Sequence, residues 1–327
     1  MKRTCKWAAA SLLLRVLSAS LYAQTCFIGN DMEESTRAAL VNTGKKYFEF
    51  AAQGDVASLR QNAIASLAAN FTGIESAVVE NKPSLLGGTA TPRSPFLLKA
   101  EGNKPLERAE FLCGVFGAQG QTANSAEFVI PNLPPGNYAI ITLDVASQKP
   151  STVTFVLQQQ GNDWKLGGFY AKPSQVSGHD GNWFLQQARN YKAKGQNRVA
   201  WYYYLQAREL LVPVSFMYTQ LTDKAYDEMQ NVKPSDLPPF DLVGAGKTYR
   251  VMDMFPVVVG NDLDLVVKYQ SASVADTGQT FQENMAVMKA LVSKYPEFRG
   301  AFAGIVARAT ETSGRDYGSL MAMKDIK

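Results

Sequence analysis

Near residue 95 the hydrophobic pattern changes its period, and this change limits the folds open to the first half of the chain. Residues 32–53 carry apolar side chains at three- and four-residue spacings, the pattern of an amphipathic helix: Leu40, Tyr47, Phe48 and Phe50. From residue 96 apolar and polar residues alternate instead, as in strands that bury one face. Helices followed by a run of strands predict an α+β fold.

Local signals divide the helical part into three helices and a loop. Gly54 ends the first helix, and Asp55 can cap a second one. Thr72 and Glu75 have the spacing of a capping box and predict a short third helix. Residues 83–95, rich in glycine, serine and threonine, are expected to form a loop.

Six strands are predicted in the alternating part. They span residues 96–100, 109–116, 126–130, 138–145, 152–158 and 164–170. We expect residues 24–172 to form one unit, in which three helices pack in the hollow of a curved antiparallel sheet.

The last predicted hairpin carries a family resemblance. It reads Val153-Thr154-Phe155-Val156-Leu157 and then Trp164-Lys165-Leu166-Gly167-Gly168-Phe169-Tyr170. Together with the order of helices and strands, it resembles the cone-shaped fold that nuclear transport factor two, ketosteroid isomerase and SnoaL-like proteins share. The resemblance implies an apolar cavity for a small ligand. The candidates to line it are Tyr47, Glu110, Asp144 and Trp164.

A second resemblance competes with the first. Residues 128–138 read Phe128-Val129-Ile130-Pro131-Asn132-Leu133-Pro134-Pro135-Gly136-Asn137-Tyr138 and are similar to a stretch of collagen-adhesin B-type sandwiches. Three leading helices do not belong in a sandwich of two sheets, so the cone-shaped fold is preferred.

Residues 181–230, beyond a polar linker at 173–180, are predicted to be helical. Their small and aromatic residues resemble a single TPR unit in spacing: Phe184, Ala188, Tyr191, Gly195, Ala200, Tyr204 and Ala207. Small residues at this spacing let two helices approach, and aromatic side chains fill the space between them. The chain departs from the pattern at Gln187, where leucine is usual, and at Pro213, which falls one place late.

The TPR resemblance implies a groove that binds a protein or peptide partner, with Asn182, Arg189 and Lys192 on it. Trp201 opens a run of four aromatic residues, which form either a partner surface or packing within this chain. Internal packing is preferred because a lone repeat cannot bury its own faces, so other domains or a third helix near 222–230 must cover it.

The prolines of residues 231–239 mark a further boundary, and residues 240–327 are expected to form a small α+β segment. Its predicted elements are strands at 249–259 and 263–269, a helix at 280–294, a helix opened by Pro296 that holds Ile305, and a strand at 317–323.

The first 23 residues have the composition of an export signal. Three basic residues begin it, residues 7–14 are apolar, and small residues follow. Cleavage is expected after Ala23, with Ser20 as the alternative. A membrane anchor is the competing interpretation, but residues 7–23 are short for a span and contain Arg15. No stable membrane span is expected after cleavage.

The formal net charge of +4 belongs to this signal segment. Residues 1–23 hold four basic residues and no acids, so their removal leaves a chain near neutrality. A neutral chain gives no reason to expect nucleic acid as a partner.

Removing the signal leaves two of the three cysteines, Cys26 and Cys113. An oxidising compartment favours their pairing, and neither lies among metal ligands. We therefore predict a Cys26–Cys113 disulfide. Lipid modification of Cys26 is not expected, because the residues before it lack the small-residue run that such a site needs.

The residues that carry chemistry argue against several classes of enzyme. His179 is the single histidine, which excludes multi-histidine metal sites, and no Gly-x-Ser-x-Gly motif accompanies it. Residues 244–248 lack the first glycine of a phosphate-binding loop. Asn261, Asp262 and Asp264 lack the further ligands of a calcium loop. No catalytic residue, metal or cofactor is expected.

Two hypotheses about function follow from the sequence. The first is an exported, non-enzymatic binding or scaffold protein, periplasmic or secreted, with a protein or peptide partner on residues 181–230. The second is a carrier or enzyme that holds a small apolar ligand in the cavity of residues 24–172.

Overall fold

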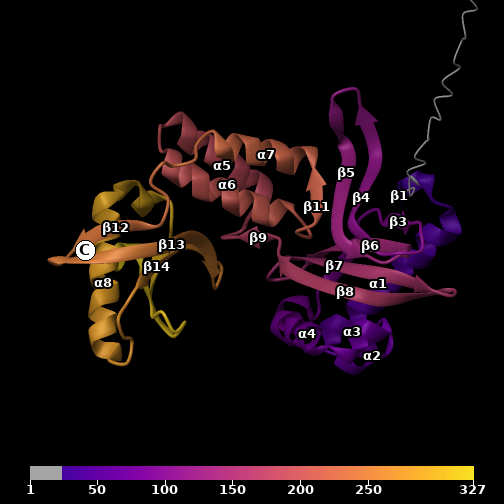
Figure 1. Ribbon diagram of the computed structural model, residues 1–327, viewed down its shortest axis with the longest axis horizontal. Helices are drawn as coiled ribbons and strands as arrows, with labels where there is room; N and C mark the ends of the chain where they lie inside the picture. Colours follow the sequence, from indigo (N-terminus) through magenta and orange to yellow (C-terminus); the bar gives the residue numbers. More distant parts are fainter. Residues whose placement is uncertain (1–23) are drawn as a thin grey trace, which may run out of the picture.

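The computed structural model describes residues 24–327, and the predicted export signal lies outside the described residues. Helices and mainly antiparallel strands build the described chain, which confirms the α+β class (Figure 1). Its first elements are β1 (Gln24–Ile28), η1 (Gly29–Asp31), α1 (Glu34–Gln53), α2 (Val56–Gln61), α3 (Ala65–Ala69), α4 (Thr72–Leu85), β2 (Thr89–Pro92), β3 (Phe96–Ala100), β4 (Leu106–Gly117), β5 (Gly120–Leu133), β6 (Gly136–Ala146), β7 (Ser151–Gln160) and β8 (Asp163–Pro173).

The first sheet has the strand order β1-β3-β6-β7-β8, with β2 paired to β6. Helices α1 to α4 cover one face, and their core is built from residues such as Leu40, Leu59 and Phe155. Helix α1 packs closely on β6 at Gly44. A side chain there would not fit, because an added Cβ would stand 2.6 Å from Ile141 Cγ2. The six predicted strands are confirmed as β3 to β8.

Two signals in the helical part are read correctly from the sequence, and two are wrong. Helix α1 ends at Gly54, whose φ of 74° is left-handed, and Asp55 caps α2 by accepting from Ser58 N. The capping box at Thr72 is absent, because Phe71 is the residue before α4 and no side chain caps it. The predicted loop 83–95 instead contains the end of α4 and all of β2.

The sequence predicts a single sheet with helices in its hollow, but the β4–β5 hairpin lies outside the first sheet. This ribbon leaves the first sheet and forms a separate one, in the order β11-β5-β4, with β11 (Met217–Thr219). It packs on the face opposite the helices, where Phe111 and Phe128 meet Leu98 and Ile140. Both faces of β6 are therefore buried, one under helices and one under the ribbon.

The later elements begin with a short antiparallel strand pair and three helices. They are β9 (Gln175–Val176), β10 (His179–Asp180), α5 (Gly181–Ala193), α6 (Asn197–Leu211), α7 (Gln220–Gln230), β12 (Phe240–Gly244), β13 (Lys247–Val259), β14 (Asp262–Gln270), α8 (Thr277–Lys294), η2 (Pro296–Gly300), β15 (Gly304–Thr310), β16 (Asp316–Ala322) and η3 (Met323–Asp325). The last sheet has the order β12-β13-β14-β15-β16, and α8 connects its one parallel pair of described strands, β14 and β15.

Helices α5 to α7 and the last sheet share one hydrophobic core. Tyr202, Tyr203 and Tyr204 are buried in it, and Tyr202 meets Phe298 and Phe302 edge-on. The preference for internal packing of this aromatic run is confirmed. The helix predicted from Pro296 to Ile305 is wrong: a short 3-10 turn ends at Gly300, and Ile305 lies in β15, where apolar residues alternate.

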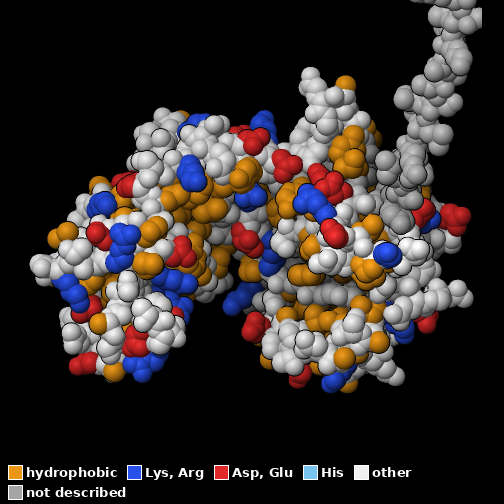
Figure 2. All heavy atoms as spheres, in the orientation of Figure 1, with side chains coloured by type: hydrophobic (Ala, Val, Ile, Leu, Met, Phe, Trp, Pro, Cys, Tyr) orange, Lys and Arg blue, Asp and Glu red, His pale blue; other side chains and the backbone are white. Residues whose placement is uncertain are grey.

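The described chain forms two lobes, which Figure 2 shows side by side with a notch between them. We call residues 24–173 the first lobe and residues 174–327 the second. Strand β11 of the second lobe pairs with β5 of the first. Further links join Lys172 Nζ to Glu209 Oε1 at 3.3 Å and Gln220 Nε2 to Gln121 O at 2.9 Å.

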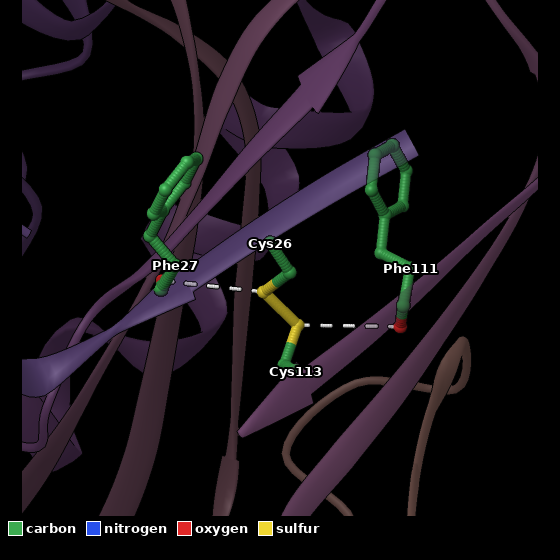
Figure 3. The surroundings of a disulfide bond; sticks show 4 residues. All are labelled: Cys26, Phe27, Phe111 and Cys113. Atoms are coloured by element: carbon green, nitrogen blue, oxygen red, sulfur yellow. Dashed lines mark hydrogen bonds between the residues drawn. A yellow bond between two sulfur atoms is a disulfide. The ribbon is translucent and has the colours of Figure 1, made fainter. Parts of the chain in front are cut away.

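The predicted disulfide is confirmed between Cys26 on β1 and Cys113 on β4, with their Cα atoms 5.1 Å apart (Figure 3). It joins the edge strand of the first sheet to the ribbon. The bond therefore fastens the two layers that enclose the second core of the first lobe.

Candidate functional site

Tyr47, a predicted cavity residue, is a structural residue in the helix-covered core. Its hydroxyl donates to the carbonyl oxygen of Trp164 at 2.8 Å and lies 3.3 Å from that of Asn62. Burial raises the pKa of Tyr47 to about 12. Trp164 is half-buried against the same core. The hydrogen-bonding capacity of Tyr47 is thus used within the protein.

The two predicted carboxylates lie elsewhere. Glu110 is exposed on the ribbon and forms an ion pair with Arg108. Asp144 is exposed on β6 and forms a bidentate pair with Arg93, with N···O distances of 2.6 and 2.9 Å. The structure therefore does not gather the four predicted residues into one cavity.

The face of α5 that the TPR resemblance assigns to a partner is partly covered by α7 of the same chain. Arg189 donates to both carboxylate oxygens of Glu228 on α7, at 2.7 and 2.9 Å. The Tyr204 hydroxyl donates to Glu228 as well, at 3.0 Å. Lys192 remains exposed, and Trp201 packs half-buried against the core of the second lobe.

Asp144 and Asn182, assigned by sequence to different sites, lie in one groove between the lobes. The groove has a volume of about 600 Å³. We call it the inter-lobe groove and define it by its lining residues: Thr91, Arg93, Asp144, Val145, Ala146, Ser147, Pro150, Thr152, Ser174, Gln175, Asp180, Gly181, Asn182, Leu210 and Leu211.

Each wall of the groove is set by its secondary structure. The first lobe contributes β2 and β6, which pair through Thr91 and Asp144. The second lobe contributes the start of α5 and the end of α6. A Cβ on Gly181 would stand 2.7 Å from Leu211 Cγ, so the two helices meet closely at this end. Such tight packing fixes the second wall.

The charges in the groove suit binding. The side chains of Arg93 and Asp144 are 45% and 52% exposed, so both can exchange their mutual contact for a ligand. Asp180 is engaged locally, because its carboxylate accepts from Trp183 N at 2.9 Å and caps α5. Leu210 and Leu211 add an apolar strip beside these polar groups.

His179 lies next to the groove, beside the lining residue Asp180. Its ring stacks on Trp183, with centroids 3.8 Å apart and planes within 6°. Its neighbour Asp180, and not His179, caps α5. In residues 24–327 no three His, Cys, Asp or Glu side chains gather where they could hold a metal ion.

No protein-family model matches the chain, and neither a curated protein nor a solved structure does. The resemblances to the cone-shaped fold and to a TPR unit stay predictions. Among helices of the described chain, none has the combined length and apolar character that crossing a bilayer requires.

Sequence reasoning missed Arg93 and the Leu210–Leu211 pair as site residues. Arg93 stands 51 positions before Asp144, in a segment predicted to be a loop, so no local spacing links the two. The two leucines continue the apolar pattern of α6 and look like core residues in sequence. Only the contact between the lobes brings them to the groove.

Proposed function

We propose that the protein is an exported, non-enzymatic binding protein that holds a segment of a protein or peptide partner in the inter-lobe groove. The observation that carries the proposal is that the groove joins two surfaces from distant parts of the sequence. Its exposed arginine and aspartate can bind backbone or side-chain polar groups, and its leucines can bind an apolar residue.

The disulfide between Cys26 and Cys113 supports export, because such bonds persist in oxidising compartments. The second hypothesis, a small ligand inside the first lobe, relied on four residues in one cavity. Their separation directs the proposal to the inter-lobe groove instead.

The test is a charge reversal at Arg93, with a matched control at Arg108. Both arginines lie on the first lobe in exposed ion pairs with a carboxylate, but only Arg93 lines the groove. A photo-reactive residue in place of Gln175 should cross-link a polypeptide in the host's envelope fraction. Arg93→Glu should lower the cross-linked yield about tenfold, and Arg108→Glu should leave it unchanged.

Native mass spectrometry of the purified complex identifies the class of occupant. A second polypeptide supports the proposal. Equal cross-linking in the two charge-reversed variants, or an added mass of only a few hundred daltons, contradicts it.

A further inference from the structure

Strand β12 is an edge of the last sheet, and one side of it has no neighbouring strand. The sheet order places β13 on its inner side, and β12 pairs with no other described strand. An open edge presents backbone N–H and C=O groups to solvent, where another extended chain can pair with them.

The turn after β12 fixes which backbone groups face outward. Ala245 and Gly246 have φ values of 51° and 75°, as in a two-residue hairpin turn. In such a hairpin the flanking Gly244 and Lys247 form the closing hydrogen-bonded pair. Hydrogen bonding alternates along an antiparallel pair, so Asp241 and Val243 direct their backbone groups away from β13.

A groove of about 780 Å³ runs beside this open edge, between residues 241–245 of β12 and its turn and one flank of α8. We call it the edge groove. Helix α8 contributes Ala286, Ala290 and Ser293, whose side chains are small. Small residues beside an open strand leave room for the side chains of an added strand.

Three common protections against pairing are missing from β12. Lysine, proline and bulges commonly block edge strands. The segment Phe240–Gly244 has no lysine or proline, and its pairing with β13 runs without a register shift. Val243 is 71% exposed, the largest fraction among the exposed large hydrophobic side chains of residues 24–327.

The charges beside the groove select the occupant. Lys289 and Lys294 line it from α8, and the Lys294 ammonium lies 4.3 Å from the centroid of the Phe240 ring. The acid in the described lining, Asp241, already pairs with Arg250 at 3.1 Å. The lining is therefore positive toward an incoming chain. A second copy of this edge would bring like charges together, which costs free energy.

We propose that the edge groove binds an extended, acidic polypeptide segment as a sixth strand of the last sheet. Its backbone bonds to the outward groups of Asp241 and Val243, and its carboxylates face Lys289 and Lys294. The site is separate from the inter-lobe groove, so the two proposals fail independently.

The backbone test uses synthetic, fluorescently labelled peptides of alternating glutamate and valine, with binding followed by anisotropy. Val243→Pro removes one outward N–H and no bond to β13, and it should weaken binding at least about tenfold. Val243→Thr keeps the N–H and a branched side chain, and it should bind within about threefold of the parent. A probe that is N-methylated at alternate amides should not bind the unmodified protein. This measurement tests backbone pairing even if Val243→Pro does not fold.

The charge test compares the acidic probe with one of alternating lysine and valine. The parent should prefer the acidic probe, and Lys289→Glu should reverse the preference. Lys224, which is exposed on α7, serves as the control. Lys224→Glu should change the affinity for neither the acidic nor the lysine probe. Arg93→Glu should also leave binding of the acidic probe unchanged.

Three results would overturn the proposal. The N-methylated probe binds as well as its parent, the lysine probe binds as tightly as the acidic one, or light scattering shows a dimer that Val243→Pro dissociates. The last result would assign the edge to a second copy of this chain.

Discussion

Asp264, on β14, is a buried carboxyl that weakens the fold when it ionises. The residue is 4% exposed, and burial, with a smaller effect of nearby Asp262, raises its pKa to about 6. The folded protein therefore holds this proton more tightly than the unfolded chain, whose pKa is near the ordinary 3.8. Stability is expected to fall as pH rises between these two values.

Replacing Asp264 with asparagine should remove this cost. We expect Asp264→Asn to raise the free energy of unfolding by on the order of 2 kcal/mol at about pH 8, and to give no gain below about pH 4. Urea denaturation at the two pH values measures both. A gain of the same size at both would show that ionisation is not its source.

The disulfide is the second residue-scale feature with a measurable effect. Its cysteines are 87 positions apart, so the bond restricts a long loop of the unfolded chain. We expect the double variant Cys26→Ser, Cys113→Ser to lose about 2–5 kcal/mol of stability. The parent under reducing conditions should match the variant. An unchanged denaturation midpoint on reduction would contradict this.

At the residue scale the sequence supported the disulfide pair but not the cavity. Removal of the signal leaves two cysteines, so their pairing needs no geometry. Tyr47 and Asp144 each fit a ligand-lining role by residue type, yet one bonds to backbone carbonyls and the other lies on the surface. Residue type alone does not tell which face of a helix or strand a side chain occupies.

At the element scale, Glu228 ties α7 to the helix pair α5–α6. Hydrogen bonding from Arg189, and also from Tyr204, lowers the pKa of Glu228 below its ordinary 4.5. A lowered pKa gives stability that is present above the unfolded value and is lost as pH falls through the folded value.

We expect Glu228→Gln to cost about 1 kcal/mol near neutral pH, a modest value because Arg189 is partly exposed. The difference from the parent should shrink below about pH 4. Asp241→Asn, in the largely exposed pair with Arg250, is the control and should change stability little. Denaturation across this range would contradict the prediction if the two variants behaved alike.

Element types were largely predictable, and element ends less so. Period-two alternation located β3 to β8, since each buries at least one face. Strand β12 was missed because it has five residues and follows prolines. Ile305 was assigned to a helix because its segment follows Pro296, whereas pairing with β14 makes it a strand.

At the scale of the whole molecule, β11 completes a sheet that the first lobe begins. We expect the fragment 24–173 to expose the whole edge of β5 and to associate, whereas β11 covers residues 126–128 of that edge in the full described chain. Size-exclusion chromatography with light scattering compares the two. A monomeric fragment with the thermal midpoint of the first transition of the full chain would contradict this.

The arrangement of the lobes could not be predicted from the sequence. It depends on contacts such as Lys172 with Glu209 and Met217 with Phe128, each between residues far apart and without a shared pattern. The groove that supports the proposed function exists only through such contacts.

Because β11 comes late in the sequence, the ribosome makes it well after its partner strand β5. Strand β5 ends at Leu133, and Met217 follows it by 84 residues. At translation rates of about 5–20 residues per second, the open edge of β5 waits on the order of 4–17 s for its partner strand. Residues 126–128 of the nascent chain thus stay without their partner strand until Met217–Thr219 has been made.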